Sequence, residues 1–108
     1  MSGLDDTAWS IRAVTGNTTL TANDYVLLVS PGSATVVITL PDATTIQPGR
    51  SYIVRRDATA TNVVQLARSG TNLINGSASN FAVGSAAAIG SAEVYSDGTN
   101  WFTLGTSV

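Results

Sequence analysis

Carboxylates are the side chains of this sequence with the most direct catalytic chemistry. Two acidic residues on opposite sides of a glycosidic bond can hydrolyse it, one as the general acid and the other as base or nucleophile. The sequence contains seven acidic residues: Asp5, Asp6, Asp24, Asp42, Asp57, Glu93 and Asp97. Most of them lie in stretches typical of turns, where Asp accepts hydrogen bonds from nearby backbone N–H groups. We therefore expect them to stabilise turns, and we predict no catalytic residue.

Histidine and cysteine are absent from the sequence. Their absence removes the commonest general base, the commonest metal ligand, every thiolate nucleophile and every disulfide. We predict that the protein is not an enzyme and that it has no metal site and no cofactor.

Charge is sparse in this chain. The basic residues are five arginines, charged residues make up 11% of the sequence, and the net charge is −2. A protein that follows a nucleic-acid backbone needs clustered positive charge, so nucleic acid is excluded as a partner. The adjacent Arg55 and Arg56 are expected at a solvated strand end or in ion pairs rather than at an anion site.

No membrane segment or signal peptide is visible in the sequence. No run approaches the roughly 18 apolar residues of a membrane helix. The N-terminal residues lack the basic and apolar regions of a signal peptide. We expect a soluble protein that is made in the cytoplasm and has no membrane partner.

The two tryptophans have different surroundings. Trp101 follows the turn sequence Asp97-Gly98-Thr99-Asn100, and strand alternation puts it on one face with Thr103, opposite Phe102 and Leu104. We favour a core position for Trp101 over a platform on which a sugar ring stacks. Trp9 lies between Leu4 and Ile11 near the N-terminus, where it could fold back on its own domain or dock into a partner. We favour docking, and we predict attachment through Leu4, Trp9, Ile11 and Arg12.

The composition favours strands over helices. β-Branched and small residues dominate, whereas the helix formers Glu, Lys and Gln are scarce. We predict strands at residues 25–29, 35–40, 52–56 and 62–66, and a hairpin formed by residues 92–96 and 101–104. Asn75-Gly76 indicates a tight turn or a loop, and residues 83–92 are expected to cross a surface or pack against a neighbouring backbone. The expected fold is all-β, a compact antiparallel β-sandwich or small barrel with little or no helix.

The predicted strand at residues 25–29 is apolar on both faces. A strand of this kind needs cover on both sides, and self-association provides the second cover. We therefore predict an oligomer interface at Tyr25, Val26 and Leu28.

Five segments in this order resemble a β domain that recurs in bacteriophage virion proteins. They are TLTANDYVLLV (19–29), ATVVITLPDA (34–43), PGRSYIVRRDATATNVVQL (48–66), NLINGSA (72–78) and VYSDGTNWFTL (94–104), and the resemblance covers roughly residues 14–106. FAVGSAAAIGSA (81–92) departs from the more polar strand of that family, and Asn75 stands where the family often has Asp. The resemblance implies a tail-fibre, tail-spike or head-decoration component of the virion, often a homotrimer.

These observations predict an N-terminal attachment arm at residues 1–13 and a β domain at residues 14–108. The short segment before the domain favours a homotrimeric capsid decoration (cement) protein over a fibre tip carried on a long shaft. Its expected partners are further copies of itself and the major capsid protein or another virion protein. The alternative is a short tail-fibre or tail-spike subunit that binds a host receptor or glycan. A free carbohydrate-binding module would need an aromatic strip on one solvent face.

Overall fold

The described part of the chain consists of nine short strands and one helical turn. The structure is a computed structural model that describes residues 10–31, 34–56, 63–83 and 90–107. The strands are β1 (Ile11–Val14), β2 (Thr18–Thr19), β3 (Val26–Val29), β4 (Val36–Thr39), β5 (Ser51–Arg56), β6 (Val64–Ala67), β7 (Phe81–Val83), β8 (Ser91–Ser96) and β9 (Trp101–Ser107). In these ranges the one helical element is the 3₁₀ turn η2 (Ala43–Thr45). The β-rich fold with almost no helix is therefore confirmed.

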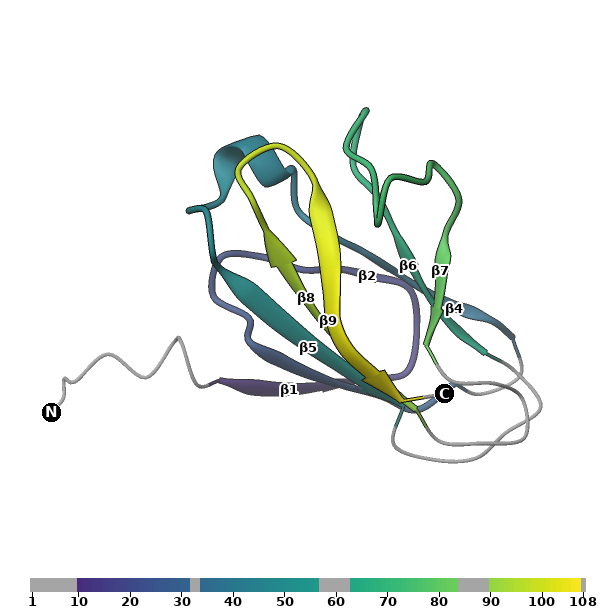
Figure 1. The fold of residues 1–108 in the computed structure, drawn as a ribbon. Coiled ribbons are helices and arrows are strands. Elements are labelled where there is room, and N and C mark those ends of the chain that lie inside the picture. Colours follow the sequence, from purple (N-terminus) through teal and green to yellow (C-terminus); the bar gives the residue numbers. More distant parts are fainter. Residues whose placement is uncertain (1–9, 32–33, 57–62, 84–89, 108) are drawn as a thin grey trace, which may run out of the picture.

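The strands form two mixed sheets. One sheet has the order β1-β3-β5-β8-β9 and the other the order β2-β4-β6-β7. Through the first six strands the chain alternates between the sheets, so that it makes three successive coils with one strand in each sheet (Figure 1). Within each sheet these strands pair in parallel, and Val26 of β3, for example, lies between Ile11 of β1 and Ile53 of β5.

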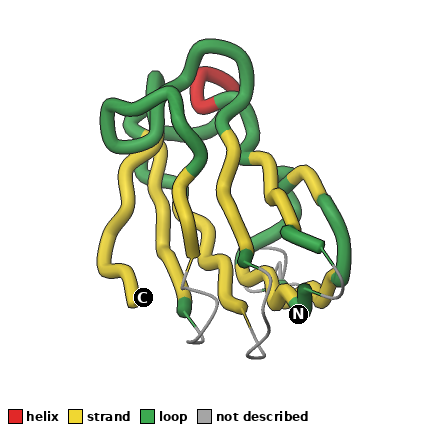
Figure 2. The backbone as a smooth tube through the Cα atoms, turned by 90° about the vertical axis from the view of Figure 1, so that its right-hand side faces the viewer, coloured by secondary structure: helices red, strands yellow, loops and turns green. Residues whose placement is uncertain are grey.

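The prediction of a purely antiparallel fold is therefore wrong. When the chain crosses to the other sheet and comes back, its next strand starts at the same end of the sheet as the strand before the crossing. The two strands therefore run in the same direction and pair in parallel. Antiparallel pairing begins where the chain stops alternating: β7 pairs with β6, β8 with β5, and β9 with β8. Figure 2 shows the loops around η2 gathered at one end of the strands.

One hydrophobic core lies against both sheets. Alternation buries every second residue of the central strands, including Leu27 and Val29 in β3 and Val36 and Ile38 in β4. Trp101 is fully buried, as predicted, in the same core cluster. The side chains of the five-stranded sheet that face the core therefore meet those of the four-stranded sheet.

Most of the predicted strands are confirmed within one or two residues. β8 and β9 form the predicted hairpin, with Ser96 paired to Trp101. Asn75 and Gly76 have φ angles of 53° and 79°, and Ile74 and Ser77 exchange two backbone hydrogen bonds of 3.0 Å across them. These residues form the tight turn that the Asn-Gly pair indicated, because both positions adopt the left-handed conformation.

The Arg55-Arg56 pair is divided between the two sides of β5. Arg55 is exposed, whereas Arg56 is fully buried on the side of Tyr52 and Val54. Strand alternation therefore placed one of the two arginines inside, although both are charged.

Candidate partner-binding surface

The outer face of the five-stranded sheet is its side opposite the core, and it carries mainly apolar side chains. Register places Ile11 beside Val26 and Val26 beside Ile53, one row across three strands. Leu28 lies two residues beyond Val26 on the same face. On β9, Phe102 and Leu104 alternate with the buried Trp101. The outer face is defined here by Ile11, Val26, Leu28, Ile53, Phe102 and Leu104, together with Tyr95.

Two of these apolar side chains are largely exposed. The exposed fraction is 66% for Ile11 and 57% for Leu104, and the other members of the outer face are half-buried by their neighbours in the sheet. Ile11 and Leu104 belong to the two edge strands, β1 and β9. The apolar surface therefore extends across the full width of the sheet, which is typical of a surface that contacts a partner.

Tyr95 and Phe102 form an aromatic pair on the outer face. They are directly opposite each other on β8 and β9, with ring centroids 5.7 Å apart and an interplanar angle of 29°. Cross-strand aromatic pairs stabilise a hairpin. Their position also places two rings beside the aliphatic members of the face.

Two opposite charges complete the outer face. Arg55 lies opposite Ser91, and Glu93 lies opposite Ile53 on the neighbouring strand, so that the two charges are diagonal neighbours. In the part of the chain that the structure describes, no ion pair joins Arg55 to Glu93. The outer face thus has one positive and one negative side chain within an apolar surround.

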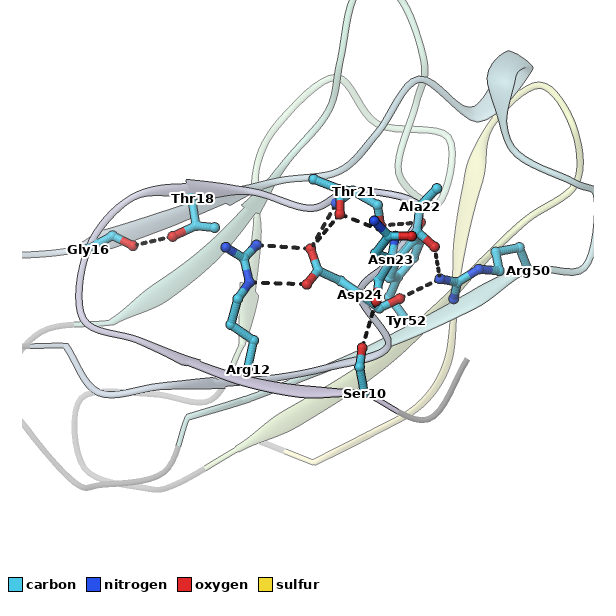
Figure 3. Close-up of polar contacts among 10 residues, drawn as sticks. All are labelled: Ser10, Arg12, Gly16, Thr18, Thr21, Ala22, Asn23, Asp24, Arg50 and Tyr52. Carbon is cyan, nitrogen blue, oxygen red and sulfur yellow. Dashed lines mark hydrogen bonds and ion pairs between the residues drawn. The ribbon is translucent and has the colours of Figure 1, made fainter. Parts of the chain in front are cut away.

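β1 is held on the sheet by a polar cluster at the start of β3 (Figure 3). The Arg12 guanidinium donates to both carboxylate oxygens of Asp24, at 3.1 and 2.9 Å. Ser10 Oγ donates to the carbonyl oxygen of Asn23 at 2.6 Å. A bidentate pair of this kind fixes the geometry of both side chains. Arg12 is therefore occupied within its own chain, on the opposite side of β1 from Ile11.

Asp24 also organises the turn that precedes β3. Its carboxylate accepts from the Thr21 backbone N–H at 2.9 Å and from Thr21 Oγ1 at 3.2 Å. Arg50 donates to the carbonyl oxygens of Ala22 and Asp24 and lies 4.2 Å from the centre of the Tyr52 ring. Tyr52 Oη donates to the Thr21 carbonyl oxygen at 3.0 Å, and burial raises the pKa of this phenol. The cluster joins β1, the turn and β5 into one unit.

The other described carboxylates include two that stabilise turns, as expected. Asp97 accepts from the backbone N–H groups of Asn100 and Thr99 at 2.8 and 2.9 Å, and these hydrogen bonds lower its pKa. Asp42 accepts from the backbone N–H and side chain of Thr44, which lower its pKa in the same way. A hydrogen bond to the charged form stabilises that form. Asp5, Asp6 and Asp57 lie outside the described residues.

The predicted attachment residues are separated by the structure. Leu4 and Trp9 lie outside the described residues. Ile11 is on the outer face, whereas Arg12 is bound to Asp24. Residues 11–13 of the predicted arm lie in β1 and so belong to the five-stranded sheet.

The predicted oligomer residues lie together on or beside β3. Val26 and Leu28 are half-buried members of the outer face, and Tyr25 immediately precedes the strand. Ile11, from the predicted attachment set, pairs with Val26, so one surface unites residues from both sets. Sequence reasoning did not assign Ile53 and Tyr95 to a surface. Their alternation with the buried Tyr52, Val54 and Val94 is the signal that could have identified them.

No protein-family model matches the sequence, and no curated protein matches it closely enough to count as a relative. The resemblance to phage virion domains therefore rests on the ordered segments of the sequence. Within the described ranges, no three acidic side chains gather into a possible metal site. Those ranges also contain no helix that is long and apolar enough to cross a membrane.

Proposed function

We propose that this protein is a structural component of a bacteriophage virion, a homotrimeric decoration protein that stabilises the capsid. The observation that supports this proposal best is the apolar outer face, which carries Val26 and Leu28 together with the strongly exposed Ile11 and Leu104. A surface of this composition gains stability when another protein covers it. In a trimer, contact between copies provides that cover.

In this proposal the protein is a non-enzymatic building block in which the two mixed sheets pack as a sandwich. The tie between Arg12 and Asp24 fixes β1 to the sheet. The segment before β1, with Leu4 and Trp9, then serves as the attachment element for the major capsid protein or another virion protein. Self-association and attachment thus use different parts of the chain.

The mass of the purified protein in solution tests the trimer. Light scattering should give about three times the chain mass of 11.1 kDa. A monomer whose mass does not change with concentration contradicts the trimer.

Binding to virus particles tests the decoration role. Expanded phage heads that lack the protein should bind it when the two are mixed, and electron microscopy should show it at regular positions on the head lattice. If the protein is seen at the tail while the heads stay bare, this result contradicts the decoration role and favours the second candidate below.

The second candidate is a short tail-fibre or tail-spike subunit that binds a host receptor or glycan. The Tyr95–Phe102 pair favours it, because aromatic rings on the outer face of a sheet can stack on sugar rings. Host surface glycans on an array should then bind the protein, and Phe102→Ala should abolish that binding. If no glycan on the array binds the protein and the protein does decorate heads, these results contradict this candidate.

A further inference from the structure

We infer that the outer faces of the copies pack together around the three-fold axis of the proposed trimer, with Arg55 of each copy meeting Glu93 of the next copy. This inference rests on the proposed self-association and deepens it. It assigns the contact to the whole face, from Ile11 on β1 to Leu104 on β9, and it names the charge pair that sets the alignment of the copies.

The charges of the outer face are self-complementary. Among the described strand residues, Arg55 and Glu93 are the two charged side chains on this face, and they have opposite signs. Their diagonal placement leaves each one available to a partner, because no ion pair joins them within the chain. In a trimer, one neighbouring copy supplies a Glu93 for Arg55 and the other supplies an Arg55 for Glu93, so that neither charge needs to be buried alone.

The apolar part of the face also fits a second copy better than a glycan. Five of its members are aliphatic: Ile11, Val26, Leu28, Ile53 and Leu104. A sugar site combines aromatic faces with converging polar groups, whereas this face has one aromatic pair at one side. The faces of the three copies cover each other's aliphatic rows, with the charges in register to prevent sliding.

A charge exchange between the two positions tests the pairing. Arg55→Glu leaves two negative charges on each face and Glu93→Arg leaves two positive charges, so each variant should self-associate at least about tenfold more weakly. The double variant R55E/E93R restores opposite charges between copies and should recover most of the wild-type affinity. The measurement is sedimentation over a concentration series. As a matched control, Arg68→Glu changes an arginine outside the strands of this sheet and should leave the affinity unchanged.

Cysteine cross-linking provides a second test that does not depend on the charge variants. The chain has no cysteine, so a mixture of R55C and E93C chains under a mild oxidant should give a disulfide-linked pair of chains. Thr99→Cys, in the exposed β8–β9 turn, should not cross-link under the same conditions.

The inference is overturned if Arg55→Glu leaves self-association unchanged, if the double variant does not recover it, or if Thr99→Cys cross-links as readily as the R55C and E93C mixture. A glycan that competes with self-association would assign the face to the tail-fibre candidate instead. Head binding is measured separately: heads decorated by a protein that does not self-associate through this face contradict the inference alone. Self-association through this face without head binding contradicts the decoration role alone.

Discussion

The indole N–H of Trp101 donates a 3.0 Å hydrogen bond to the carbonyl oxygen of Pro41. This bond joins the first residue of β9 to the segment that follows β4, a strand of the other sheet. Tyr52 packs against the same indole with ring centroids 5.7 Å apart. Trp101 thus holds the C-terminal hairpin against both sheets and has its polar atom satisfied inside the core.

The first prediction concerns the stability that Trp101 provides. Trp101→Ala should lower the free energy of unfolding by about 3–5 kcal/mol, because it opens a large cavity and leaves the Pro41 carbonyl without its donor. Urea unfolding measures the loss. Trp101→Phe keeps most of the packing and should cost clearly less. Equal losses for the two variants would show that the hydrogen bond, and not the packing, dominates.

The second prediction concerns Trp9 and attachment. Trp9→Ala, or deletion of residues 2–9, should leave the unfolding transition near that of the wild type and weaken head binding by about thirtyfold, the effect of losing roughly 2 kcal/mol at a hot spot. The deletion stops before β1, which begins at Ile11. Melting curves and head-binding assays check both parts. A large drop in melting temperature for Trp9→Ala would instead place this side chain in the fold.

The third prediction concerns the pair that holds β1. Asp24 has an exposed side-chain fraction of 8% and Arg12 one of 43%. Asp24→Ala should therefore cost about 1–3 kcal/mol, because it leaves the Thr21 N–H without its acceptor. Arg12→Ala should cost under about 1 kcal/mol, because the pair is partly solvated on that side.

Hydrogen exchange locates the effect of these two substitutions. The amide of Val26 donates to the carbonyl oxygen of Ser10, just before β1, and the amide of Ser30 donates to that of Val14 in β1. Their exchange should become faster in Arg12→Ala. The amide of Leu40, which donates to Ala67 in the other sheet, is the control and should not change. Uniform acceleration of all three amides would mean that global stability, and not the hold on β1, was altered.

The fourth prediction concerns the dependence of the fold's stability on acidic pH. The pKa values of Asp42 and Asp97 are lowered below the ordinary 3.8 by hydrogen bonds to their charged forms. Each carboxylate therefore stabilises the fold at pH values above 3.8, and its contribution is lost as the pH falls through the lowered pKa. Unfolding measured through this range should show stability that decreases with acid.

Asn substitutions isolate these two groups. The D42N/D97N double variant should have a flatter dependence of stability on pH below 3.8 than the wild type. At neutral pH it should be the less stable protein, and the difference should shrink in acid. A constant difference across the series would mean that the hydrogen bonds do not depend on ionisation.

The hairpin and the core position of Trp101 could be predicted because their signals are local. Asp97-Gly98 specifies a turn, and alternation then decides which of Trp101 and Phe102 faces the core. The parallel pairing could not be predicted in this way, because strands alternate with the same period in parallel and antiparallel ladders. The direction of β3 relative to β5 depends on the path of the chain through β4 in the other sheet.

β1 shows a different limit of sequence reasoning. The sequence predicts residues 11–13 as part of an arm because they precede the segments that resemble the virion domain. In the structure β1 has no fully buried residue, and Val14 is its one residue that packs on the core. Its place in the sheet depends on Asp24, twelve residues from Arg12, and no periodic pattern reveals such a pair. The outer face shows the same limit. Val26 and Leu28 are recognisable in the sequence as apolar residues, but the row formed by Ile11, Val26 and Ile53 follows only from the register of the strands.

The alternation of the chain between the two sheets also has a consequence for the order of events during synthesis. The five-stranded sheet begins with β1 and ends with β9, and the largest fully buried side chain, Trp101, is the first residue of that last strand. Until β9 leaves the ribosome, the inner residues of earlier strands lack the Trp101 indole, against which Tyr52 packs. Parallel pairs between distant segments also form slowly, because long loops must close first. The nascent chain should therefore complete its fold only after translation has passed Trp101.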